Sequence, residues 1–117
     1  MALSLHQAGV NVRVYEAVRK MAPLGVGINL QPTAVRELAE LGIGKSLANV
    51  GNETQNLSYF NKLGQHIYTE KRGTKAGYNW PQYSIHRGKL QTLLLESVRD
   101  RIGYQNVRNG LRFISFE

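Results

Sequence analysis

Residues 2–16 read ALSLHQAGVNVRVYE, and this stretch decides the fold class expected for the chain. Ala2–Ala8 is compatible with a helix that stops at Gly9, because glycine is the residue most often found just past a helix end. The alternating valines that follow predict a short strand over Val12–Tyr15. A helix that feeds such a strand normally comes after an earlier strand, so the pattern is expected to begin inside an α/β unit.

The middle of the chain predicts a mixture of short helices and extended segments. Gly25–Leu30 is a glycine-spaced extended stretch, and Pro32 suits the first turn of a helix that closes at Gly42. The other segments expected here are a loop over Ala17–Leu24, a short helix over Lys45–Val50, an irregular stretch over Gly73–Pro81 and an extended run over Tyr83–His86. Leu57–Phe60 and Gln65–Glu70 are predicted to pair as an antiparallel hairpin, since the intervening Asn-Lys-Leu-Gly suits a turn.

The last third of the chain contains the clearest helical pattern. Leu90, Leu93, Leu94 and Val98 fall at helical spacing and predict a helix over Arg87–Arg101 that ends at Gly103. Val107 and the run Leu111–Phe116 are then expected to form one strand or two. The order of the elements predicts an α/β fold in a single domain over residues 1–117.

Composition narrows the function classes. Hydrophobic residues make up 42% and charged residues 20% of the chain, which is ordinary for a globular protein. The net charge of +7 favours anionic partners, although the basic residues are spread without a run of like charges. The absence of cysteine excludes disulfides, thiolate metal sites and a cysteine nucleophile. With no long apolar run and no signal-peptide pattern over Met1–Gly9, we expect a cytoplasmic protein that does not enter the membrane.

Glu16 is the first candidate for a binding residue. It follows the predicted valine strand, and an acid at such a strand end accepts hydrogen bonds from the adenosine ribose in dinucleotide-binding units. The glycine-rich fingerprint of these units lies about 20 residues before the acid, which would place it upstream of Met1. By itself, however, an acid after a strand is also typical of a solvated strand end.

Four stretches taken in order resemble one enzyme family. They are LSLHQAG at 3–9, VRVYE at 12–16, PLGVGINLQP at 23–32 and SIHRGKL at 84–90. Together they resemble the FAD-dependent monooxygenases of the para-hydroxybenzoate hydroxylase class, closest to the phenazine hydroxylase-like branch. The resemblance covers nearly the whole chain. It implies a partial FAD-binding, Rossmann-like domain with an antiparallel hairpin insertion, lacking the first strand and glycine loop.

The resemblance also assigns roles to residues of this chain. It implies that Glu16 binds the adenosine ribose and that Arg87 lies near the FAD pyrophosphate and ribityl groups, where a cation at a helix start suits phosphate. It places the backbone of Gly25, Val26 and Gly27 beside the flavin ring, and backbone near Phe113 beside the adenine. One departure is Ala17, where many relatives carry arginine, so that Arg19 or Lys20 is a candidate replacement.

The activity implied is hydroxylation of a small aromatic substrate, with FAD as cofactor and NADH or NADPH as co-substrate. The flavin carries such chemistry, so we expect no catalytic acid, base or nucleophile among these residues. The three histidines show no metal-ligand spacing with carboxylates, so no metal site is expected. We expect the isolated chain to be inactive as a hydroxylase. Two alternatives remain, a basic nucleic-acid-binding module and a non-catalytic interaction module.

Overall fold

The computed structural model describes residues 1–22 and 25–115 of the chain. They divide into two compact units, one formed by Met1–Gly25 with Arg87–Glu117 and the other by Val26–His86. Each unit is described by itself below. Parts of two predicted segments lie outside the described residues: Pro23 and Leu24 of the expected loop, and Phe116 of the expected last strand.

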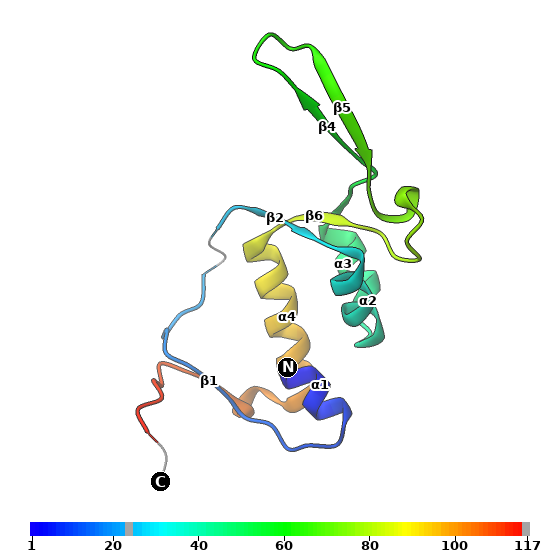
Figure 1. The fold of residues 1–117 in the computed structure, drawn as a ribbon. Coiled ribbons are helices and arrows are strands. Elements are labelled where there is room, and N and C mark those ends of the chain that lie inside the picture. Colours follow the sequence, from blue (N-terminus) through cyan, green and yellow to red (C-terminus); the bar gives the residue numbers. More distant parts are fainter. Residues whose placement is uncertain (23–24, 116–117) are drawn as a thin grey trace. The chain divides into compact units, whose positions relative to one another are not determined.

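The first unit contains two helix–strand pairs. They are α1 (Ala2–Gln7) with β1 (Val14–Glu16), and α4 (Arg87–Ile102) with β7 (Val107–Asn109), the latter joined through the 3-10 turn η2 (Tyr104–Asn106). The strands β1 and β7 run parallel, with Val14 opposite Val107 and Glu16 opposite Asn109. The helix α1 packs against α4 (Figure 1). This is the α/β architecture expected from the opening residues.

Apolar side chains of both helices and of β7 hold this unit together, and of the predicted stripe on α4 Leu90 is buried while Leu93, Leu94 and Val98 are half-buried. Leu3 of α1, Leu90 and Ile102 of α4 and Val107 of β7 are all buried. The basic residues Arg99 and Arg101 occupy the last turn of α4, where positive charge is favourable beside unpaired carbonyl groups. The predicted helix over Arg87–Arg101 is therefore confirmed and extends by one residue to Ile102.

The second unit is built around a small antiparallel sheet. The strand β6 (Tyr83–His86) lies between β2 (Gly27–Leu30) and β3 (Asn52–Glu53), and the helices α2 (Pro32–Glu40) and α3 (Gly44–Val50) pack on each other. Its buried apolar residues are Val35, Ile43, Leu47, Tyr83 and Ile85. The expected helix start at Pro32 and the short helix before Gly51 are confirmed.

The hairpin expected in this unit is also present. The strands β4 (Asn56–Phe60) and β5 (His66–Lys71) pair antiparallel, with a register irregularity between Tyr59 and Phe60. In the turn, the Asn61 side-chain oxygen accepts hydrogen bonds from the backbone amides of Leu63 and Gln65. The ladder carries cross-strand pairs as well, including stacked Tyr59 and Tyr68 rings.

Three predictions about local structure need correction. The run from Leu111 is not a strand over the described residues 111–115, because none of them takes part in a described strand pairing, although the Leu111 amide bonds to the Glu16 carbonyl at the end of β1. Within the irregular stretch, Gly73–Ala76 forms a 3-10 turn, η1. The first strand is shifted to Val14–Glu16, and the two-residue strand β3 was not predicted.

Candidate functional site

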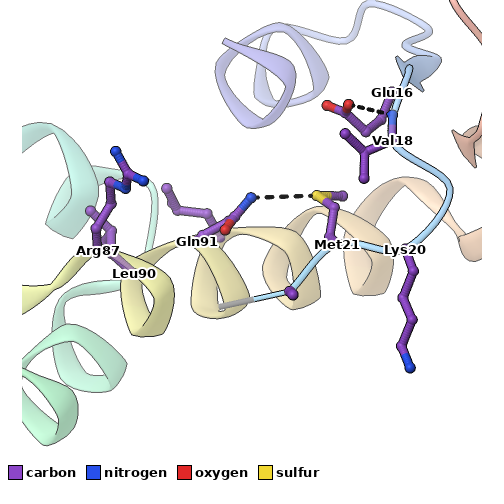
Figure 2. Close-up of a pocket in the computed structure, with 9 residues that line it drawn as sticks. Glu16, Val18, Lys20, Met21, Arg87, Leu90 and Gln91 are labelled. Atoms are coloured by element: carbon purple, nitrogen blue, oxygen red, sulfur yellow. Dashed lines mark hydrogen bonds between the residues drawn. The ribbon is translucent and has the colours of Figure 1, made fainter. Parts of the chain in front are cut away.

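The first unit contains a cavity of about 590 Å³. One wall follows the loop after β1 and is formed by Glu16, Val18, Lys20, Met21 and Ala22. The other wall is one face of α4, formed by Arg87, Leu90, Gln91 and Leu94. Leu90 and Gln91 follow Arg87 by three and four residues, and Leu94 follows them by four and three, so the helix presents all four on one face. Figure 2 shows Arg87, Leu90 and Gln91 along this face. Glu16 and Arg87, two of the binding residues predicted from the sequence, therefore line the same cavity.

Glu16 is held in place by its backbone and by its side chain. The Glu16 carbonyl accepts a hydrogen bond of 3.0 Å from the Leu111 amide, and Glu16 is opposite Asn109 in the parallel pairing of β1 with β7. Its carboxylate oxygen Oε1 accepts a hydrogen bond of 2.8 Å from the Val18 amide. An ionised carboxylate has about four acceptor positions, so capacity remains for a ligand's hydroxyl groups.

Arg87 occupies the first position of α4, where the helix begins directly after β6. The first backbone amides of a helix have no partner within it, and the helix dipole places partial positive charge at the same end. No acidic residue lies in the first turn of α4 to compensate this charge. The guanidinium and the helix start together favour an anion such as a phosphate group.

The two ends of the cavity differ in charge, and the wall between them is mostly apolar. Figure 2 shows Glu16 and Arg87 at opposite ends of the view, with Met21 and Gln91 between them. The amide Nε2 of Gln91 donates a hydrogen bond of 3.6 Å to the sulfur of Met21. This bond ties the loop to the helix. The arrangement suits an elongated ligand with hydroxyl groups at one end and an anion at the other.

The remaining predicted site residues are not all brought to this cavity. Gly25 lies beside the Arg87 guanidinium, within the same unit. Val26 and Gly27 begin the second unit and do not line the cavity. Phe113 is 73% exposed and borders a separate hollow of about 370 Å³ with Tyr15 and the neighbouring residues of its own segment.

The two candidate replacements for the missing arginine are separated by the structure. Lys20 lines the cavity, although Figure 2 shows its side chain extending away from Glu16. The Arg19 side chain lies against Gly110 instead, since a Cβ at Gly110 would be 3.1 Å from Arg19 Cγ. Sequence reasoning did not identify Met21 and Gln91. The helical spacing of Gln91 from Arg87 was the one signal that could have indicated its place.

The part of the chain that the structure describes shows neither a metal-binding cluster nor a membrane-spanning helix. Among residues 1–22 and 25–115, no group of three or more histidine or acidic side chains could hold a metal ion. No helix in the same part of the chain is long and apolar enough to cross a membrane.

The chain is similar to known proteins over nearly its whole length. No family model matches the chain. A phenazine 1,6-dicarboxylic acid hydroxylase, PhzS of Lysobacter antibioticus, is 49% identical over 117 residues, which covers 99% of this chain. An FAD-dependent urate hydroxylase of Mycolicibacterium vanbaalenii is 25% identical over 99% of the chain. The chain is homologous to FAD-dependent aromatic monooxygenases.

Solved structures share the fold of this chain. The crystal structure of the R204Q variant of Klebsiella pneumoniae HpxO complexed with FAD matches 95% of this chain with a TM-score of 0.74 and 25% identity. The chain spans 29% of the length of each of the two curated relatives and 28% of the HpxO chain. It thus corresponds to between a quarter and a third of the length of these relatives.

Proposed function

We propose that this chain binds the adenosine diphosphate half of FAD in an aromatic hydroxylase that uses NADH or NADPH and oxygen. Glu16 would accept hydrogen bonds from the adenosine ribose hydroxyls, and Arg87 with the start of α4 would hold the pyrophosphate. The observation that carries this proposal is the common cavity of the two residues. Homology to FAD-dependent hydroxylases supports the identity of the ligand.

The cavity has the size and chemistry that this ligand requires. Its volume of about 590 Å³ lies within the range of small-molecule sites, roughly 300–1,000 Å³. A carboxylate suits paired hydroxyl groups, and a guanidinium suits a diphosphate because it donates from a planar fork. The side chains of Val18, Leu90 and Leu94 supply the apolar wall between them. Gly25 leaves space for the guanidinium where a side chain would not.

The other assignments follow from the family resemblance. The backbone of Gly25, Val26 and Gly27 would pass beside the flavin ring, and the backbone around Phe113 would approach the adenine. When bound, the flavin would supply electron transfer from the nicotinamide and activation of oxygen. The substrate would be a small aromatic molecule, as the name of the phenazine dicarboxylic acid hydroxylase indicates for that relative. The residues of this chain would hold the cofactor and take no proton from the substrate.

Titration with FAD and with ADP tests the proposal. Glu16→Gln and Arg87→Ala should each weaken FAD binding by about tenfold to a hundredfold, since a hydrogen bond to a charged group contributes about 1.5–3 kcal/mol. Glu37→Gln and Lys62→Ala are matched controls, because both residues are exposed, lie outside the cavity and belong to neither β1 nor α4. Equal affinities for site and control variants would contradict the proposal.

A second measurement concerns the activity of the isolated chain. We expect little or no oxidation of NADH or NADPH when FAD and candidate aromatic substrates are supplied. The known relatives contain much more chain than the part that matches here. Stoichiometric FAD binding with sustained NADPH turnover would contradict this expectation.

A further inference from the structure

The Arg87 side chain occupies the space where a Cβ atom of residue 25 would lie. A Cβ atom built on Gly25 would lie 2.5 Å from Arg87 Nε and 2.8 Å from both Cζ and Nη2. Separations below 3.0 Å are essentially never seen for real Cβ atoms. Any other residue at position 25 would therefore have to displace the guanidinium or move the backbone.

The backbone at Gly25 adds a second constraint. Its φ is +125°, a conformation that residues with a side chain rarely adopt. Gly9, in the same unit, also has a positive φ of +79° but has open space where its Cβ would point. An alanine would be strained at either position because φ is positive at both. Only at position 25 would its Cβ also meet a functional side chain, that of Arg87.

We propose that Gly25 is a positioning residue that sets the direction of the Arg87 guanidinium toward the cavity. An arginine side chain is long and flexible, and its far end can occupy many positions unless neighbouring atoms restrict it. The bare backbone of Gly25 lets the guanidinium lie against it, beside the first turn of α4. An added methyl group would turn the guanidinium away, while the helix itself keeps its contacts. This inference rests on the proposed role of Arg87 in FAD binding.

A double-mutant cycle on FAD affinity tests the coupling. The dissociation constant is measured for the unchanged chain, Gly25→Ala, Arg87→Ala and the double variant, with Gly9→Ala as the control. Gly25→Ala should weaken FAD binding by about tenfold, part of the loss expected from deleting the charged contact. The double variant should bind as Arg87→Ala alone does, and Gly9→Ala as the unchanged chain. Equal losses from Gly25→Ala with and without Arg87 would overturn the proposal.

A spectroscopic readout separates this inference from the proposed function. The Nε–H resonance of Arg87, measured by NMR without any ligand, should shift in Gly25→Ala and stay in place in Gly9→Ala. If it shifts while the unchanged chain fails to bind FAD, the positioning role holds and the proposed function fails. An unshifted resonance in a folded Gly25→Ala chain would overturn the positioning role.

Circular dichroism monitors whether the variants fold. If Gly25→Ala alone is unfolded, the proposal requires that the double variant with Arg87→Ala recovers the fold, because the clashing group is then gone. A double variant that stays unfolded would show that backbone strain at Gly25 dominates, and would overturn the proposal.

Discussion

Glu16, which closes the strand β1, and Arg87, which opens the helix α4, line the same cavity of about 590 Å³. They lie at opposite ends of it, with Met21 and Gln91 between (Figure 2). The two residues should therefore contact different parts of one ligand.

This separation predicts that the two residues can be distinguished by ligands of different length. Glu16→Gln should weaken adenosine and ADP alike, because both carry the ribose hydroxyls. Arg87→Ala should weaken ADP by about tenfold or more and leave adenosine unchanged, because only ADP carries the pyrophosphate. Calorimetric titration of both ligands measures the effect, with Lys62→Ala, an exposed position in the β4–β5 turn, as the control. A loss of adenosine affinity in Arg87→Ala equal to the loss for ADP would contradict the assignment.

The hydrogen bond between Gln91 and Met21 should restrict the loop that forms one wall of the cavity. Gln91→Leu removes the donor, so amide hydrogen exchange over residues 17–22 should accelerate by about two- to tenfold, as expected for one hydrogen bond. Gln55→Leu, at an exposed position outside the cavity, is the control. Unchanged exchange in Gln91→Leu would show that other contacts hold the loop.

Leu47 is 0% exposed and should contribute strongly to the stability of the second unit. Leu47→Ala should lower the free energy of unfolding by about 2–5 kcal/mol, because it leaves a cavity among buried side chains. Leu63, in the hairpin turn, is 75% exposed, and Leu63→Ala should change the free energy by less than about 0.5 kcal/mol. Urea unfolding measures both, and similar effects for the two variants would contradict the packing described.

Tyr83 should make stability depend on pH in the alkaline range. Burial, and to a smaller extent the charge of Glu53, raise the pKa of Tyr83 above its ordinary value of 10.0. Above that value the unfolded chain loses the phenol proton first, so the native state binds more protons and the free energy of unfolding falls as pH rises. The stabilising effect is complete below pH 10 and disappears as pH passes the raised pKa.

Urea unfolding between pH 9 and 11 checks this dependence. Tyr83→Phe should remove its contribution, and Glu53→Gln should reduce it only partly, because the charge is the smaller cause. A slope that is the same in Tyr83→Phe as in the unchanged chain would contradict the assignment.

Much of the local structure could be predicted from sequence because it depends on short-range chemistry. The leucine spacing predicted α4, the proline predicted the start of α2, and the Asn-Lys-Leu-Gly turn predicted the β4–β5 hairpin. The position of Glu16 at a strand end and of Arg87 at a helix start followed from the same patterns. Periodicity and turn chemistry are properties of neighbouring residues, so a sequence displays them directly.

The tertiary structure decided that the end of β1 and the start of α4 line one cavity, and which side chains lie between Glu16 and Arg87. The parallel pairing of β1 with β7 fixes Glu16, and the Leu111 amide bonds to the Glu16 carbonyl although the described residues 111–115 do not form the predicted strand. The contact of Gln91 with Met21 and that of Gly25 with Arg87 also join segments distant in sequence. Such contacts depend on long-range packing and on the space that neighbouring side chains leave, and residue patterns along the chain carry no measure of either.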